Sequence, residues 1–347
     1  MPTLSSLHLA GWKSIRDQRI DFGRINVLIG ANGSGKSNLI SFLRLAGNVP
    51  YYLDYHVAEE GGADSVLYLG TKVTQKIQST FVLREEDGRE SQTQLELVPS
   101  PVNRLVIMRH GVARTSQSVE DLLFEQSIAL RGLSKIKSFH FSDTTTFSPL
   151  RRDCDLNLNR EFQSDGNNLP AMLYLYSQKH PAAYRRIVSA VKSVAPFFDD
   201  FLLEPLRLNP NRISLRWRAV GKEYEFGPHQ LSDGTLRAIA LFTLLLAPDE
   251  DRPSLIVLDE PELGLHPSAI TIFADLVKAA SVHSQIVLAT QSTTLVDHFE
   301  AQDIIAVNSR NGESIFERLD PVRLKTWLEE YSIGELWEQN VIGGGPY

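Results

Sequence analysis

A glycine-rich octapeptide constrains this chain more than any other feature. Residues 30–37 read Gly-Ala-Asn-Gly-Ser-Gly-Lys-Ser and fit the spacing G-x-x-x-x-G-K-[ST] of a P-loop. The apolar run 24–29 before it predicts a buried strand, and apolar residues at helical spacing after it predict a helix that ends near Gly47. A strand, a loop and a helix in this order form the context in which the motif binds nucleotide phosphates.

The residue types of the loop suit phosphate binding. Glycines let backbone N–H groups turn toward phosphate oxygens, and the start of the helix directs its positive end at the anion. We expect Lys36 to bridge the β- and γ-phosphates of ATP and Ser37 to ligate Mg²⁺. The alternative, a glycine-rich turn with a chance lysine, leaves the flanking strand and helix unexplained. The predicted nucleotide-binding residues of the loop are Asn32, Gly33, Ser34, Gly35, Lys36, Ser37 and Asn38.

Two carboxylates end a second buried strand. Residues 254–258 lead directly into Asp259 and Glu260, which is the Walker B arrangement. Because this strand would end beside the P-loop, we expect Asp259 to reach the Mg²⁺ shell. Glu260 would then orient and polarise the attacking water as a catalytic residue, together with Lys36 on the phosphates. The alternative is an acidic turn after a buried strand.

A third motif lies fewer than thirty residues before the second strand. Residues 231–235 read Leu-Ser-Asp-Gly-Thr and open an apolar helix, for which Ser232 is a good N-cap. Alone, this pattern predicts only a capped helix. In this position it resembles the signature motif of the ATP-binding-cassette (ABC) ATPases, which is usually written LSGGQ.

The order of these motifs extends the resemblance. With the opening 11–15 (Gly-Trp-Lys-Ser-Ile), the chain looks like the ABC-type ATPase heads of the RecF, SMC and OLD group. The ending 327–337 with Ile342-Gly343-Gly344 resembles stand-alone bacterial predicted AAA-type ATPases, which are often found in defence-type operons. The resemblance is specific for about 1–50 and 228–310 and loose in the middle.

The resemblance implies a division of roles between two copies. Ser232, Asp233 and Gly234 would contact the γ-phosphate bound by a partner copy in a head-to-tail dimer. Gln291 stands where the family usually carries histidine, so it is our third catalytic candidate, although it cannot carry a proton. A merely polar strand-end residue is the alternative. Two further assignments stay open: the Q-loop residue, sought at 141–143, and His266, which either contacts the partner head or precedes Pro267 at a helix start.

We therefore predict an α/β fold, a P-loop NTPase with an ABC-ATPase-like mixed core sheet flanked by helices. Residues 1–50 and 228–347 would form the nucleotide-binding core, and 51–227 an inserted β-sheet and helical lobe between the P-loop helix and the signature. The detailed expectations are two strands within 4–22, antiparallel strands over 66–110, helices at 119–137, 169–179 and 181–194, a hairpin from 212–217 to 222–226, and a final strand at 286–292.

Composition limits the partners. The net charge of −7 argues against a uniformly basic nucleic-acid binder. Local clusters are basic, however: 101–152 carries eight Lys/Arg against four acids, and 207–222 carries five against none. DNA is therefore a predicted partner, with a solvated basic face as the alternative. A single cysteine and the absence of a signal-peptide pattern predict a cytoplasmic protein, and the longest apolar run, 238–247, is too short to span a membrane.

These inferences predict an ATP-binding and ATP-hydrolysing switch. It would form a homodimer or higher oligomer on binding ATP and Mg²⁺, and act in DNA repair or anti-phage defence. Only 56 residues follow Gln291, so a nuclease or toxin effector would be a separate protein. One alternative is the ATPase subunit of a transporter, which the signature variant and the large insertion disfavour. The other is a nucleotide-dependent scaffold with little hydrolysis, which Asp259 and Glu260 disfavour.

Overall fold

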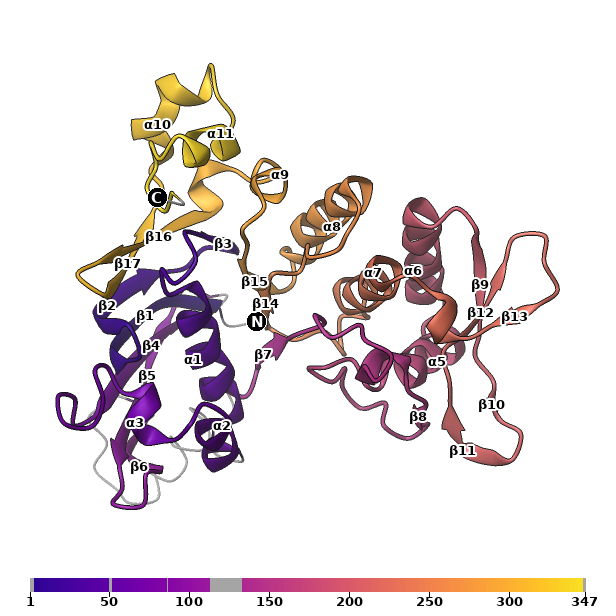
Figure 1. The fold of residues 1–347 in the computed structure, drawn as a ribbon, viewed down its shortest axis with the longest axis horizontal. Coiled ribbons are helices and arrows are strands. Elements are labelled where there is room, and N and C mark those ends of the chain that lie inside the picture. The colour runs from indigo at the N-terminus through magenta and orange to yellow at the C-terminus, as the bar shows by residue number, and fades with distance from the viewer. Residues whose placement is uncertain (1–2, 50–51, 86, 113–132, 346–347) are drawn as a thin grey trace. The chain divides into compact units, whose positions relative to one another are not determined.

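The computed structural model describes residues 3–49, 52–85, 87–112 and 133–345 (Figure 1). The chain forms two compact units: 1–138 with 253–259 and 284–347, and 139–252 with 260–283. The antiparallel strands that were expected in the inserted lobe belong to the first unit. The boundaries of the two units therefore differ from the domain boundaries predicted at 51 and 228. The predicted domain boundaries stay a prediction. Most of the helix predicted at 119–137 lies outside the described residues.

The first unit contains a six-stranded mixed sheet in the order β17-β16-β3-β15-β14-β7. The strands β16, β3, β15 and β14 are parallel, and β17 pairs antiparallel with β16. Nearly every residue of β3, β14 and β15 is buried, which explains why these strands read as continuous apolar runs. Their bounds are β3 Ile25–Ile29, β7 Ile136–Phe139, β14 Leu255–Asp259, β15 Gln285–Ala289, β16 Ile304–Arg310 and β17 Glu313–Arg318.

A second, antiparallel sheet covers the helix that follows the P-loop. Its order is β2-β1-β4-β5-β6, and α1 (Lys36–Asn48) packs against it. Phe42 of α1 lies 5.4 Å from the Trp12 ring and 6.0 Å from the Phe81 ring, measured between centroids. The remaining bounds are β1 Thr3–Trp12, β2 Ile15–Asp21, β4 Ile77–Arg84, β5 Glu90–Pro99, β6 Leu105–Val112, α2 Leu53–Glu59, α3 Ala63–Val66, α9 Thr293–Val296, α10 Pro321–Leu328 and α11 Ile333–Glu338.

The second unit is built on four helices. These are α5 (Leu169–Lys179), α6 (Pro181–Val194), α7 (Asp233–Leu245) and α8 (Pro267–Ala280), and α6 packs against the other three. Two three-stranded sheets, β10-β11-β8 and β13-β12-β9, complete the unit. Their strands are β8 Cys154–Asp155, β9 Phe198–Leu202, β10 Pro205–Leu206, β11 Asn209–Ile213, β12 Arg216–Ala219 and β13 Glu225–Phe226. No helix in the described ranges is long and apolar enough to cross a bilayer.

Most local expectations are confirmed, and two are wrong in part. The helices at 169–179 and 181–194 and the strands within 4–22 and 66–110 are present. The hairpin holds only from β12 to β13, because β11 turns away and pairs with β8 and β10. The strand at 286–292 is not the last of the sheet, since β16 and β17 follow it. The Asn311-Gly312 turn between them, with φ angles of 55° and 81°, is a hairpin signal present in the sequence.

Candidate nucleotide site

The P-loop leaves β3 at Gly30 and ends in the first turn of α1. Gly33 and Gly35 have φ angles of 78° and 109°, a region that glycine adopts without strain. A Cβ atom on Gly35 would lie 1.9 Å from the Ser314 hydroxyl oxygen, so no side chain fits there. A Cβ atom on Gly33 would meet nothing within 4 Å. The loop is therefore a tight turn that is closed by β17 at Gly35 and accessible at Gly33.

The side chain of Lys36 folds back into the P-loop. Its Nζ donates to the carbonyl oxygens of Gly30 at 2.6 Å and Ala31 at 3.1 Å, and the residue is 6% exposed. Gly35 is the N-cap of α1 and has no side chain to occupy the amides of the first turn, which also carries no acidic residue. A buried ammonium beside the start of a helix forms the positive cradle that a polyphosphate needs.

The side chain of Asn38, which was predicted to contact the nucleotide, forms a hydrogen bond within the protein. Its Nδ2 donates to Ser14 Oγ at 2.6 Å, and Ser14 Oγ lies 2.6 Å from Ser314 Oγ. Ser314 in turn donates to the carbonyl oxygen of Ser34 at 2.7 Å. This chain of hydrogen bonds ties the P-loop to the β1–β2 turn and to β17. The predicted nucleotide contact of Asn38 stays a prediction.

The carboxyl ends of β3, β15 and β14 meet at one edge of the sheet. In this parallel register Ala289 of β15 pairs with both Leu28 of β3 and Asp259 of β14. Neighbouring strands lie about 4.8 Å apart, so Asp259 ends roughly 10 Å from the strand that carries the P-loop. Gln291 follows β15, the strand between them, and is exposed. The sheet thus brings the P-loop, Asp259 and Gln291 to the same edge.

The oxygen donors at this edge suit Mg²⁺. Ser37 is exposed on the first turn of α1, and Asp259 is partly exposed at the end of β14. Within the described residues, no group of three or more His, Cys, Asp or Glu side chains could hold a metal ion by itself. A hydroxyl and one carboxylate, completed by phosphate oxygens and water, are the donors that Mg²⁺ takes in nucleotide sites. Ser37 and Asp259 therefore fit this ion.

Glu260 follows Asp259 with a left-handed backbone, at a φ of 45°. This conformation costs a non-glycine residue about 1–2 kcal/mol. The turn after it is closed by hydrogen bonds from Leu263 N to the Glu260 carbonyl at 3.2 Å and from Leu265 N to the Glu262 carbonyl at 2.9 Å. A residue held in a sparsely populated conformation directly after a strand-end carboxylate marks a candidate functional position.

The signature residues form the start of α7, as predicted. Ser232 is the N-cap, and its Oγ accepts a hydrogen bond from Thr235 N at 3.2 Å. A Cβ atom on Gly234 would lie 2.4 Å from the carbonyl oxygen of Gly264, so only glycine fits in this turn. Ser232 and Asp233 are exposed. The signature therefore combines an exposed turn with a packed glycine, and its contact with a partner's nucleotide stays a prediction.

A buried arginine organises the signature turn. Arg151, which is 7% exposed, donates to the carbonyl oxygens of Thr144 at 3.0 Å, Pro228 at 2.5 Å and Leu231 at 3.3 Å. Its second terminal nitrogen donates to the Asp233 carboxylate at 2.6 Å. In the sequence Arg151 was only one member of a basic cluster, and no local pattern pointed to these partners.

Replacing Arg151 by alanine should destabilise the second unit. The change removes a buried donor from three carbonyl oxygens, of which Pro228 O still accepts from Leu231 N at 3.2 Å, and should lower the free energy of unfolding by about 3 kcal/mol. Little of this loss comes from the ion pair, because the Asp233 side chain is 67% exposed. The matched control is Arg152→Ala at the exposed neighbouring position, expected within ~0.5 kcal/mol of wild type. Urea unfolding followed by far-UV circular dichroism checks both, and equal midpoints would contradict the assigned role of Arg151.

The candidate Q-loop segment is attached to α7. Arg237 donates from Nε to the Phe141 carbonyl at 2.9 Å and from a terminal nitrogen to the Ser142 carbonyl at 2.8 Å. Burial lowers the pKa of this guanidinium from its ordinary value, and the charges of Asp233 and Glu262 oppose that shift. The assignment of 141–143 as the Q-loop stays a prediction.

His266 is the N-cap of α8. Its Nδ1 accepts from Ser268 N at 3.3 Å and lies 2.8 Å from Ser268 Oγ. Pro267 occupies the first turn of the same helix, where its missing N–H costs nothing. These contacts support the helix-start interpretation of His266, the second of the two alternatives left open by the sequence.

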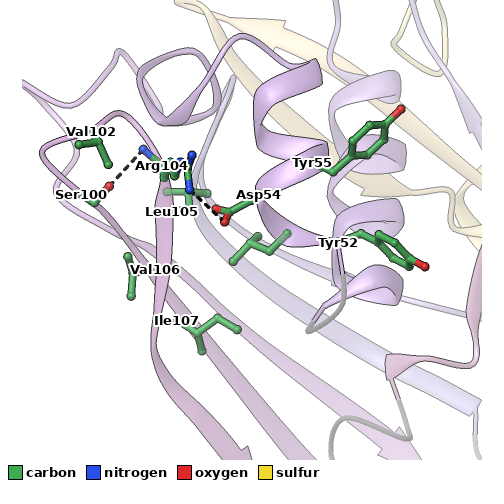
Figure 2. Close-up of a pocket in the computed structure, with 10 residues that line it drawn as sticks. Tyr52, Asp54, Tyr55, Ser100, Val102, Arg104, Leu105, Val106 and Ile107 are labelled. Carbon is green, nitrogen blue, oxygen red and sulfur yellow. Dashed lines mark hydrogen bonds and ion pairs between the residues drawn. The ribbon is translucent and has the colours of Figure 1, made fainter.

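A separate pocket of about 780 Å³ lies between α2 and β6. Figure 2 shows Asp54 of α2 facing Arg104, with 3.6 Å between carboxylate and guanidinium, and Arg104 N donating to Ser100 Oγ at 3.2 Å. None of the predicted nucleotide residues lines this pocket. Its other lining residues are Tyr52, Leu53, Tyr55, Val102, Leu105, Val106 and Ile107.

Family comparison agrees with this geometry. Residues 99–297 match the family described as "AAA domain, putative AbiEii toxin, Type IV TA system", and residues 6–175 match a second AAA-domain family. The first match covers more than half of the chain, so the protein belongs to that family. Both matching families are AAA domains, so the chain is a P-loop protein of the AAA type. A search of curated proteins found no match.

Solved SMC head domains share the fold. A crystal structure of the SmcHead bound to the C-winged helix domain of ScpA matches with a TM-score of 0.68 and 18% identity, over 93% of this chain and 99% of that chain. A Smc head from Pyrococcus furiosus, bound to the C-terminal domain of ScpA, matches at 0.67 and 17%, over 95% and 99%. The SMC head from Thermotoga maritima matches at 0.52 and 17%, over 91% and 99%. These likenesses confirm the predicted P-loop NTPase fold.

Proposed function

We propose that this protein is an ATP-hydrolysing switch whose composite sites form between two copies arranged head to tail. One observation supports the proposal: the chain carries both a P-loop and a signature-like turn, the two parts that such a site would need. The P-loop with its buried Lys36 belongs to the first unit, and the exposed signature turn at Ser232 belongs to the second. ATP held by one copy would be covered by the signature of the other, and hydrolysis would separate them.

The residues have distinct roles in this proposal. Lys36 and the α1 amides hold the β- and γ-phosphates, while Ser37 and Asp259 hold Mg²⁺, which supplies positive charge at the phosphate oxygens. Glu260 orients the attacking water and accepts its proton. Gln291, at the same sheet edge, donates a hydrogen bond to the γ-phosphate.

The proposed partners are DNA and a separate effector protein in the cytoplasm, in repair or anti-phage defence. The family description names a putative toxin, and two of the three solved heads are bound to a domain of ScpA, which supports a second protein as the effector. Support for DNA is weaker, since three of the five cations of 207–222 form ion pairs with acids of the same unit. Paired cations offer less net charge to phosphates. The pairs are Arg212 with Asp153, Arg216 with Glu225 and Arg218 with Asp199.

Mixing two inactive variants tests the composite site. Lys36→Ala should disable the P-loop of its own chain, and Ser232→Arg should place a bulky side chain on the exposed signature turn. Homodimers of either variant then have two defective sites. A mixed dimer combines one intact P-loop with one intact signature, so an equimolar mixture should hydrolyse ATP at roughly a quarter of the wild-type rate, since half of the dimers are mixed and each has one working site.

Two controls make this result specific. Ser232→Ala removes the N-cap without adding bulk and is expected to destabilise α7 by only about 1 kcal/mol. A double variant, in which every chain carries both Lys36→Ala and Ser232→Arg, should be inactive because it has neither an intact P-loop nor an intact signature. A mixture of the single variants that hydrolyses no more ATP than its components do separately would refute sites shared between copies.

A further inference from the structure

A glycine that follows α11 lies against the start of the P-loop. Gly343 and Gly344 follow α11 with φ angles of 77° and 68°, a conformation that favours glycine. A Cβ atom on Gly344 would lie 3.1 Å from the Gly30 Cα and 3.3 Å from the Ile29 carbonyl oxygen. The backbone of Gly344 therefore touches the junction at which β3 becomes the P-loop.

Two hydrogen bonds fix Gly344 in this place. Its N–H donates to Asn308 Oδ1 at 2.6 Å, and its carbonyl oxygen accepts from Trp337 Nε1 at 2.6 Å. Trp337 is 5% exposed, and Asn308 follows Val307 on β16. A Cβ atom on Gly30 would lie 2.4 Å from the Val307 carbonyl oxygen. Gly30 is thus enclosed between β16 and Gly344.

The other end of α11 reaches the segment that follows β15. Gly334 N donates to Asp297 Oδ1 at 2.6 Å, and a Cβ atom on Gly334 would lie 2.8 Å from the same oxygen. Asp297 ends α9, whose N-cap, Ser292, directly follows Gln291. Residues 332–345 therefore contact both the P-loop and the segment that carries Gln291.

We propose that residues 332–345 are a positioning element of the nucleotide site, which holds Gly30 and through it Lys36. Lys36 Nζ donates to the Gly30 carbonyl at 2.6 Å, so a displacement of Gly30 moves an acceptor that holds the ammonium. The segment acts through the loop and does not itself touch ATP. The inference rests on the proposed function, because it requires that the P-loop binds ATP.

Three variants of the full chain test this element. Gly344→Ala forces a Cβ atom toward Gly30, and Asn308→Ala removes the acceptor of the Gly344 N–H, whereas Asn308→Asp keeps an acceptor oxygen. We expect the Kd of MgATP, measured by titration calorimetry, to rise about tenfold in both alanine variants, because Asn308→Ala loses a hydrogen bond and the Cβ atom of Gly344→Ala displaces Gly30. In Asn308→Asp the Kd should stay within ~3-fold of wild type.

The matched control is Trp327→Ala, on α10 of the same terminal region, where the side chain is 45% exposed. Its Kd should equal that of wild type, and thermal unfolding shows that each variant is folded at the temperature of titration. An unchanged Kd in Asn308→Ala and in folded Gly344→Ala overturns the positioning role, as does an equal rise in Trp327→Ala. If Gly344→Ala does not fold, the comparison of the Kd of Asn308→Ala with that of Asn308→Asp tests the positioning role.

The wild-type protein separates this inference from the function on which it rests. If wild type binds MgATP and Lys36→Ala does not, while Gly344→Ala and Asn308→Ala bind normally, only the positioning element is refuted. If wild type does not bind MgATP at all, the proposed function and the positioning element fail together.

Discussion

Replacing Lys36 by alanine is expected to raise the Kd of MgATP at least ~100-fold and to abolish hydrolysis. The ammonium lies within the loop, on the carbonyl oxygens of Gly30 and Ala31, and is 6% exposed. Charge-assisted hydrogen bonds to phosphate stabilise by about 1.5–3 kcal/mol each, and Lys36 would form bonds to two phosphates. Their loss corresponds to roughly 100-fold or more in affinity. Titration calorimetry and phosphate release measure the two effects.

The control for Lys36→Ala is Lys76→Ala. Lys76 is about half exposed and forms a surface ion pair with Glu96 at 3.5 Å. Such pairs contribute about 0–1 kcal/mol, so this variant should bind and hydrolyse ATP as wild type does. A folded Lys36→Ala protein that still turns over ATP would remove the P-loop from the mechanism, and a loss of affinity in both variants would point to a general effect of charge.

Features carried by consecutive residues could be predicted from the sequence. The P-loop, the strand that ends at Asp259 and the helix capped by Ser232 each consist of a short motif and its flanks. Because the periodicity of the flanks fixes strand or helix, the motifs fall on the expected elements. Parallel strands also end at a common edge, which is why the sequence could place Asp259 at the same sheet edge as the P-loop.

Features that depend on distant residues could not be predicted. Ser314 supports the P-loop from 280 residues away, and Arg151 supports the signature from about 80. A single serine or arginine has no local pattern that reveals such a partner. Gly344 is similar: the terminal glycines were part of a family resemblance, and only the fold brings them to Gly30.

The prediction of a hairpin from 212–217 to 222–226 was wrong in its first strand for a related reason. Residues 212–217 alternate between polar and apolar side chains, as in a strand, but alternation does not specify the partner strand. Arg212 and Ile213 pair with Asp155 and Cys154, and the Arg212 guanidinium is bound to Asp153, so non-local pairing decides the sheet. The local turn at 220–221 fixed only the neighbouring strands β12 and β13.

The Glu260→Gln variant is expected to bind MgATP normally and to hydrolyse it at least ~100-fold more slowly, as for the loss of a general base. Glutamine has the shape of glutamate but cannot accept the proton of the attacking water. The backbone strain at this position, with φ at 45°, is the same for both side chains, so stability should not change. The control is Glu250→Gln, an exposed position paired with His180 at 3.2 Å.

Slow hydrolysis should make the ATP-bound dimer of Glu260→Gln accumulate. Light scattering should show a doubled mass with MgATP and not with MgADP, because only ATP retains the γ-phosphate that joins the two halves of the site. The same measurement with double-stranded DNA tests the proposed partner: DNA that binds the dimer and not the monomer must lower the ATP concentration needed for doubling. A variant that binds saturating ATP yet keeps its mass would refute head engagement. One that hydrolyses ATP at the wild-type rate would show that another group activates the water.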